Sequence, residues 1–198
     1  MPLFIKICGL RTREIVDTCV ALGVDAVGFV FAESSVRYLE PAAARDLGAG
    51  IPSSVERVGV FLKQPVDSVL ATLDKAGIGT AQLHGDYDAR DVATLESAGI
   101  SVIRALTVSS LVREPVASGR LLIDGDHPGS GAEFPAALLA GVSLPEGWIL
   151  AGGLTPLNVA RRVRELAPSG VDVSSGVESS RGMKSAELVE QFVRAARG

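Results

Sequence analysis

Three side chains that can give or take a proton stand at the ends of predicted strands. Cys8 ends the stretch Phe4–Cys8, His84 follows residues 80–83, and Asp124 ends residues 121–124. Enzymes built of alternating strands and helices place their chemistry where the carboxyl ends of the strands meet the loops. A thiol, an imidazole and a carboxyl group at one such edge could perform general acid–base catalysis.

The first of these strands carries polar residues where an inert core would be apolar. Side chains alternate between the two faces of a strand, so Lys6 and Cys8 share one face with Phe4, and the two isoleucines share the other. Gly9 then permits a sharp turn, and Thr12 is a candidate N-cap for the helix that follows. The sequence therefore predicts a strand, a turn and a helix, with a lysine one step below a thiol.

Composition limits the classes of protein to which the chain can belong. Its 198 residues, of which 47% are hydrophobic, suit a single domain over residues 1–198 with a full core. Apolar runs stay well short of the roughly 18 residues that a membrane helix needs, and the N-terminus has no secretory pattern. The net charge is −4 with scattered charges, which argues against a nucleic-acid partner. Cys8 and Cys19 are expected to be free thiols, which indicates a cytoplasmic protein.

Strands and helices are predicted to alternate along the whole chain. The predicted strands are residues 4–8, 25–31, 57–61, 80–83, 101–106, 121–124, 148–151 and 171–173. The predicted helices begin near residues 13, 41, 65, 89, 110, 134, 156 and 185. Such tandem units favour an α/β fold, a closed (β/α)8 TIM barrel with short loops, over an open doubly wound sheet. Within that barrel, Arg104 is expected to face inward.

Two glycine-bearing segments follow the last two predicted strands. Gly152 and Gly153 come after residues 148–151, and Ser175 and Gly176 come after residues 171–173. In barrels of this kind, the loops after the seventh and eighth strands often bind phosphate through backbone N–H groups. The two segments could also be plain tight turns.

A set of motifs runs in order along nearly the full length of the chain. The motifs are Lys6–Gly9 (KICG), Asp25–Phe29 (DAVGF), Ser35–Tyr38 (SVRY), Arg57–Phe61 (RVGVF), Gln82–Gly85 (QLHG), Leu122–Asp124 (LID), Gly129–Gly131 (GSG), Gly152–Leu154 (GGL) and Asp172–Glu178 (DVSSGVE). On these motifs the chain resembles the phosphoribosylanthranilate isomerase family of tryptophan biosynthesis.

The resemblance implies a (β/α)8 barrel that performs an Amadori rearrangement, the third step of tryptophan synthesis from chorismate. The substrate is N-(5-phosphoribosyl)anthranilate and the product 1-(2-carboxyphenylamino)-1-deoxyribulose 5-phosphate. The family uses no cofactor and no metal. Asp124 would be the general acid that opens the ribose ring, and Cys8 the general base that removes the C2′ proton. The expected assembly is a monomer or a homodimer.

The resemblance also implies how the substrate is held. Arg37, on the loop after the second strand, would bind the anthranilate carboxylate, for which a guanidinium fork is well suited. His84 is expected among the substrate-binding residues. The phosphate would lie on the backbone of Gly152, Gly153, Ser175 and Gly176. One segment departs from the family, because residues 126–132 lack the lysine that relatives often carry after the sixth strand.

Barrel closure leads to one expectation that the resemblance does not supply. The first and eighth strands become neighbours, which brings Lys6 beside Asp172 in the interior. We expect the two to form an ion pair, because an unpaired buried charge is too costly. The pair would place a cation below the thiol of Cys8.

Other functions are compatible with parts of the pattern. Cys8 could be a buried small apolar residue, Asp124 a loop cap, and Arg37 an ordinary solvated charge. A phosphate-binding lyase would need a Schiff-base lysine, for which Lys6 is the candidate on a strand. An epimerase would need metal-binding histidines, and the chain has only 2 histidines. A degenerate barrel that only binds an anionic metabolite is a non-enzymatic alternative.

Overall fold

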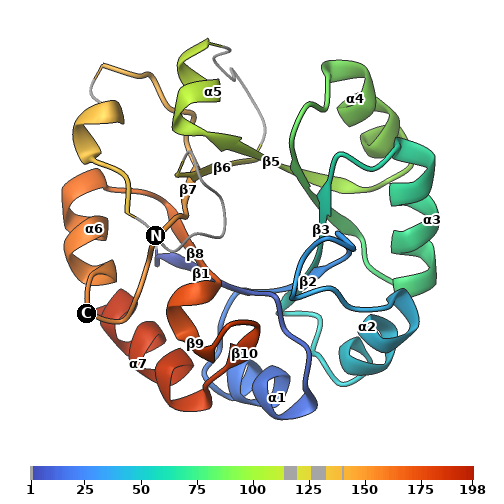
Figure 1. Cartoon of the computed structure of the whole chain (residues 1–198), viewed down its shortest axis with the longest axis horizontal. Coiled ribbons are helices and arrows are strands. Elements are labelled where there is room, and N and C mark those ends of the chain that lie inside the picture. The colour runs from blue at the N-terminus through green and yellow to red at the C-terminus, as the bar shows by residue number, and fades with distance from the viewer. Residues whose placement is uncertain (1, 114–119, 126–132, 140) are drawn as a thin grey trace.

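The chain forms a closed barrel of parallel strands, β1 to β8, surrounded by helices (Figure 1). The computed structural model describes residues 2–113, 120–125, 133–139 and 141–198. The barrel strands are β1 (Phe4–Cys8), β2 (Ala26–Val30), β3 (Glu56–Leu62), β4 (Thr80–His84), β5 (Ser101–Thr107), β6 (Arg120–Asp124), β7 (Ile149–Leu150) and β8 (Gly170–Val173). The predicted (β/α)8 barrel is confirmed.

The helices follow the strands in turn. They are α1 (Arg13–Ala21), α2 (Pro41–Gly48), α3 (Val66–Ala76), α4 (Ala89–Ser97), α5 (Val108–Arg113), α6 (Val159–Leu166) and α7 (Ala186–Arg197). Two short 3₁₀ helices are η1 (Ala136–Leu139) and η2 (Ser175–Val177), and a small hairpin pairs β9 (Glu178–Ser180) with β10 (Met183–Lys184). None of the helices in the described ranges is long and apolar enough to cross a membrane.

Local signals explain where several of these elements begin and end. Gly9 adopts a φ of 79° directly after β1, which is the sharp turn expected there. Thr12 occupies the N-cap position of α1 with an extended backbone, although its side chain makes no capping hydrogen bond. Asp88 caps α4 by accepting from the backbone N–H groups of Arg90 and Asp91.

Alternation along the strands separates two apolar regions. Ile5 and Ile7 point outward and pack under the helices, in the main core. A second cluster fills the lower barrel interior with Ala26, Val58, Ile103, Ala105, Leu122, Ile149 and Ala151. Above it, Cys8 contacts only a small group of apolar neighbours near the carboxyl ends of the strands. The barrel is therefore plugged by apolar side chains below and opens above.

The ion pair between Lys6 and Asp172 lies inside this barrel, as expected. Their Cα atoms are register partners across the β1–β8 seam, and Lys6 Nζ donates to Asp172 Oδ1 at 2.8 Å. The Lys6 side chain is 0% exposed and that of Asp172 is 8% exposed. Burial alone would lower the pKa of Lys6, but the attraction of Asp172 raises it, so the lysine stays charged.

Charged residues also close the opposite, amino-terminal end of the barrel. Arg120 donates two hydrogen bonds to the Glu56 carboxylate, at 2.7 and 2.9 Å, and Thr80 donates a third. The Arg120 guanidinium also lies 5.4 Å from the centre of the Phe4 ring. Burial acts to raise the pKa of Glu56, but these hydrogen bonds outweigh it and lower that pKa.

Two expectations from the sequence need correction, and one element was missed. Arg104 does not face inward: its neighbours Ile103 and Ala105 occupy the interior, and Arg104 Nη2 donates to the carbonyl of Tyr87. The helix expected from residue 156 begins at Val159, because the Asn158 side chain accepts from Thr155 N and holds residues 155–158 in a turn. The hairpin β9–β10 was not predicted at all.

Removing the lysine of the interior pair should destabilise the whole barrel. We expect Lys6→Met to lower the free energy of unfolding by about 3–5 kcal/mol, because it leaves the buried Asp172 carboxylate unpaired. Urea denaturation followed by circular dichroism measures this loss. The double variant Lys6→Met/Asp172→Leu should recover most of it, since neither charge of the pair then remains.

The control is Lys75→Met, at an exposed position on α3, which should change stability by less than about 0.5 kcal/mol. If Lys6→Met were as stable as this control, the pair would not be the costly buried interaction that its geometry indicates.

Candidate active site

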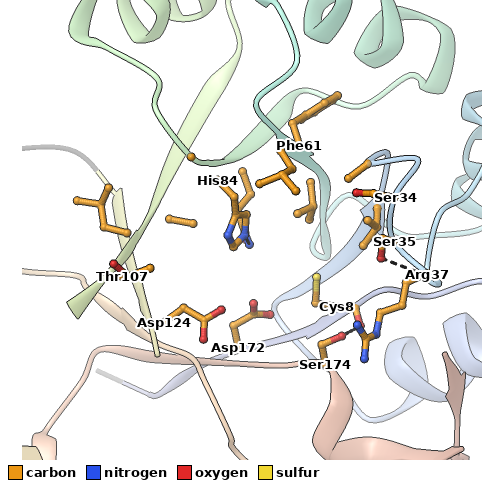
Figure 2. A pocket seen from close by; sticks show the side chains of 18 of the residues that line it. Cys8, Ser34, Ser35, Arg37, Phe61, His84, Thr107, Asp124, Asp172 and Ser174 are labelled. Atoms are coloured by element: carbon orange, nitrogen blue, oxygen red, sulfur yellow. Dashed lines mark hydrogen bonds between the residues drawn. The ribbon is translucent and has the colours of Figure 1, made fainter. Parts of the chain in front are cut away.

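A cavity of about 460 Å³ opens at the carboxyl ends of the barrel strands. Cys8, His84 and Asp124, which end β1, β4 and β6, all line it, as do Asp172 from β8 and Arg37 from the loop after β2. Figure 2 shows these side chains directed toward the same space. The structure thus brings together the thiol, the imidazole and the carboxyl group that the sequence singled out.

Cys8 lies against the lysine beneath it. A Cβ atom built on Gly28 would lie 2.8 Å from Cys8 Sγ and 3.2 Å from Lys6 Nζ, so both groups approach one point on β2. Only glycine leaves the space in which the ammonium can reach the sulfur. Burial raises the pKa of Cys8, while the charge of Lys6 and its hydrogen bond to the thiol act to lower it. Burial, with the charge of Asp172, outweighs these effects, so the pKa of Cys8 stays above its ordinary value and Lys6 reduces the size of that rise.

Asp124 is a carboxyl group that holds its proton unusually well. Burial raises its pKa to about 6, and the nearby negative charge of Asp172 adds to this, against a hydrogen bond from Gly125 N at 2.7 Å. Figure 2 shows the two carboxyl groups next to each other, with Asp172 on the side of Cys8. A carboxyl group with a pKa near 6 can still donate a proton close to neutral pH.

His84 is held as a neutral imidazole. Its Nε2 lies 2.8 Å from Gln82 Nε2, and burial lowers its pKa to about 4. Since the amide nitrogen of Gln82 is a donor, this ring nitrogen acts as the acceptor. Gln82 Oε1 is buried and has no hydrogen-bond partner among the described residues. A neutral ring on the cavity wall can donate or accept a hydrogen bond with a ligand, but it cannot supply positive charge.

Arg37 meets a carboxylate of the protein itself. Its Nε and Nη2 donate to the two oxygens of Glu178, at 2.6 and 3.0 Å. Lys184 Nζ donates to the same carboxylate at 2.7 Å. Burial would raise the pKa of Glu178, but these hydrogen bonds lower it to about 2. The two cations share one anion, so this wall of the cavity keeps an excess of positive charge.

The glycine segments lie beside the cavity lining rather than within it. A Cβ on Gly152 would lie 2.7 Å from Asp124 Oδ1, and one on Gly176 would lie 1.8 Å from the carbonyl oxygen of Leu154. The loops after β6, β7 and β8 therefore pack backbone to backbone. The N–H groups of Gly153, Ser175 and Gly176 donate to no atom of the described residues.

Several cavity residues were not singled out from the sequence. Ser34, Thr107 and Arg181 line the cavity, and Lys184 lies behind it. None of these four residues belongs to a motif or a periodic pattern in the sequence. The only signal near them is Glu178, the partner of Lys184 and the last residue of the motif Asp172–Glu178. The departing segment at residues 126–132 lies outside the described residues. Within the part of the chain that the structure describes, no group of three or more His, Cys, Asp or Glu side chains could hold a metal ion.

The fold and this cavity define an α/β-barrel enzyme with a thiol and a carboxyl group at the carboxyl ends of its strands. Residues 5–195 match the family model described as N-(5'phosphoribosyl)anthranilate (PRA) isomerase. The chain belongs to the N-(5'-phosphoribosyl)anthranilate isomerase family.

Individual relatives are similar to this chain over nearly its full length. The N-(5'-phosphoribosyl)anthranilate isomerase of Rhodospirillum rubrum is 42% identical over 98% of this chain and 97% of its own. A crystal structure of the Jonesia denitrificans relative covers 99% of this chain and 97% of its own, with 39% identity and a TM-score of 0.88. A phosphoribosyl anthranilate isomerase in complex with reduced 1-(o-carboxyphenylamino)-1-deoxyribulose 5-phosphate has a TM-score of 0.87 at 31% identity, over 99% of each chain.

The glycine beside the thiol gives a direct test of the Cys8 environment. Gly28→Ala should slow alkylation of Cys8 by iodoacetamide about tenfold at pH 8, because the new methyl group pushes Lys6 and the sulfur apart and raises the thiol pKa. Peptide mass spectrometry would separate Cys8 from Cys19, whose buried thiol has a pKa of about 12.

Gly79→Ala is the matched control, because a Cβ there meets nothing within 4 Å. Equal alkylation rates in the two variants would mean that the contact between the lysine and the thiol does not govern the reactivity of Cys8.

The raised pKa of Asp124 should also appear in the pH dependence of stability. Its folded pKa of about 6 exceeds that of an unfolded aspartate, about 3.9, so the folded state binds the proton more tightly. Ionisation of Asp124 therefore costs stability as pH rises from about 4 to 6, and the cost persists above that range.

Asp124→Asn removes this cost. The free energy of unfolding of this variant should equal that of the unsubstituted protein at pH 4 and exceed it by at most about 3 kcal/mol at pH 7.5. Urea denaturation at the two pH values measures it. A gain of equal size at both values would assign the effect to packing and not to ionisation.

Proposed function

We propose that this chain catalyses the Amadori rearrangement of N-(5-phosphoribosyl)anthranilate to 1-(2-carboxyphenylamino)-1-deoxyribulose 5-phosphate. The observation that carries the proposal is one cavity lined by two proton-exchanging groups with different surroundings. Asp124 has a raised pKa of about 6, and Cys8 lies beside a buried ammonium. Residues 1–198 would act as one domain. The cytoplasmic location of the protein and its assembly as a monomer or homodimer stay predictions.

The first step assigned to the site opens the ribose ring. Protonated Asp124 gives its proton to the ring oxygen as the C1′–O bond breaks, and the nitrogen lone pair forms a C1′=N iminium. The donor becomes a carboxylate beside Asp172. A donor with a pKa near 6 is suited to this step, because it is partly protonated at neutral pH and still acidic enough to transfer a proton.

The second step removes the proton from C2′. The thiolate of Cys8 takes that proton, and the electron pair of the C–H bond forms C1′=C2′ and neutralises the iminium. The resulting enolamine then tautomerises to the C2′ ketone. The positive charge of Lys6 supports the thiolate before the step and is held in place by Asp172 throughout.

The excess positive charge on the wall formed by the β2 loop and the hairpin would bind the anthranilate carboxylate. Arg37 keeps Nη1 free of the Glu178 bonds, and Arg181 lines the same cavity from the turn between β9 and β10. His84 would contribute a neutral hydrogen bond to the sugar. The unbonded N–H groups of Gly153, Ser175 and Gly176, with Gly152 beside Asp124, support a phosphate site after β7 and β8.

The lyase alternative is weakened by the state of its candidate lysine. Lys6 is buried, charged and bonded to Asp172, whereas a Schiff base requires a free amine that can reach the substrate. The 3-hexulose-6-phosphate synthase of Salmonella typhimurium has a TM-score of 0.72 at 16% identity, a likeness that concerns the fold alone.

The test is to generate phosphoribosylanthranilate in solution and to follow the loss of its fluorescence on addition of the protein. The unsubstituted chain should turn it over. Cys8→Ser and Asp124→Asn should each lower kcat by at least about 100-fold, which is the usual contribution of a positioned acid or base. Binding of the reduced product analogue should stay within a fewfold of the unsubstituted value.

Cys19→Ser is the control for loss of a thiol, because Cys19 lies on the buried face of α1, in the core, and does not line the cavity. Absence of turnover by the unsubstituted chain would overturn the proposed reaction. Turnover at an undiminished rate in Cys8→Ser or Asp124→Asn would overturn the role of that residue.

A further inference from the structure

The hairpin β9–β10 carries a buried lysine for which the proposed reaction has no role. The Lys184 side chain is only 2% exposed, and its ammonium donates three hydrogen bonds. Burial lowers the pKa of Lys184, while the hydrogen bond and the charge of Glu178 act to raise it. Its Nζ reaches the carbonyl oxygen of Ser174 at 2.9 Å, the hydroxyl of Ser174 at 3.1 Å and Glu178 Oε1 at 2.7 Å. Burial of an ammonium group has a large free-energy cost, so the partners that offset this cost indicate the role of the residue.

One set of these contacts leads to Cys8. The Ser174 hydroxyl, which accepts from Lys184, donates to the carbonyl oxygen of Cys8 at 3.2 Å (Figure 2). That carbonyl belongs to the residue that carries the thiol, at the point where β1 ends. Lys184 therefore fixes the backbone of Cys8 through a single intervening hydroxyl.

The other set leads to Arg37. Glu178 receives Lys184 on Oε1 and both Nε and Nη2 of Arg37, while Gly182 N donates to Oε2 at 3.0 Å. The stem of Arg37 crosses directly over the turn after Cys8, because a Cβ on Gly9 would lie 2.8 Å from Arg37 Cδ and 3.4 Å from Ser174 Oγ. Arginine, serine and the turn after β1 are thus packed together under the hairpin.

The charges of this network do not cancel. Arg37 and Lys184 bring two positive charges to the single carboxylate of Glu178, and Lys6 is already balanced by Asp172. A bridge that served folding alone would be expected to pair its buried charges one to one. The surplus positive charge instead faces the side of the cavity where the thiol lies.

We propose that Lys184 is a positioning residue that holds the base Cys8 and the substrate-binding Arg37 in one fixed arrangement, through Ser174 and Glu178, and supplies positive charge to the thiolate. This inference rests on the proposed function for the roles of Cys8 and Arg37. It assigns the hairpin between β8 and α7 to the active site.

The test measures the pH dependence of Cys8 alkylation, which needs no substrate and so stands apart from the proposed reaction. The charged or titratable groups that line the cavity of the thiol or act on it come from several elements: Lys6, Arg37, His84, Asp86, Asp124, Asp172, Arg181 and Lys184. Of these, Lys184→Met changes only the last. It should raise the midpoint of the alkylation profile by about one pH unit and lower kcat about tenfold.

Two further variants separate positioning from a general loosening of the hairpin. Glu178→Gln removes a negative charge, so it should not raise the midpoint, but it frees Arg37 and should raise KM about tenfold. Lys184→Arg keeps the charge and should return the midpoint most of the way to the unsubstituted value. Lys75→Met, which removes an exposed lysine, should leave both the alkylation midpoint and kcat unchanged.

Should Lys184→Met fail to fold, Ser174→Ala tests the same connection, since it removes only the hydroxyl between Lys184 and Cys8. It should lower kcat about tenfold with an unshifted midpoint, because the charge stays while the backbone contact is lost. The inference is overturned if Lys184→Met or Ser174→Ala matches Lys75→Met, or if Lys184→Met and Glu178→Gln move the midpoint in the same direction. If the unsubstituted chain turns over phosphoribosylanthranilate in that case, the proposed function survives without the inference.

Discussion

The ion pair between Lys6 and Asp172 is the interaction on which the rest of the structure depends. It joins the first and last strands of the barrel at matched positions, with 2.8 Å between the charged atoms. Neither charge could remain in the interior without the other, because burial of a lone charge costs several kcal/mol. The pair therefore specifies the register in which the barrel closes. It also divides the interior into an apolar plug below and a polar cavity above.

The same pair acts on the two proton-exchanging groups in opposite senses. The ammonium of Lys6 acts to lower the pKa of Cys8 against the effect of burial. The carboxylate of Asp172 adds to burial in raising the pKa of Asp124. In the proposed reaction Cys8 must lose its proton and Asp124 must keep its own, and the nearer charge of the pair acts in the required direction on each of them. Two titratable groups with divergent surroundings are the usual arrangement in acid–base catalysis.

Local and near-neighbour rules were enough to predict much of this molecule from its sequence. Lys6 and Asp172 could be paired because alternation along a strand and closure of the barrel leave few possible partners. The same alternation misplaced Arg104, because β5 is apolar on both faces and its register cannot be assigned from the strand alone. The hairpin β9–β10 could not be predicted, since it carries no apolar pattern and its Glu178 binds Arg37, which is distant in the sequence. The positions of the glycine loops were predictable, whereas their close backbone packing on one another was not, because it joins loops that are distant in the sequence.

The apolar plug of the lower barrel affects how this chain can diverge. Ile103, Leu122 and Ile149 fill the plug and form no part of the cavity wall. Selection retains substitutions among these residues if the chain still folds. It retains substitutions on the upper rim if the substrate is still converted. Selection can thus act on the two halves of one barrel almost separately. A descendant could acquire a new substrate by altering its rim while it inherits the foundation intact.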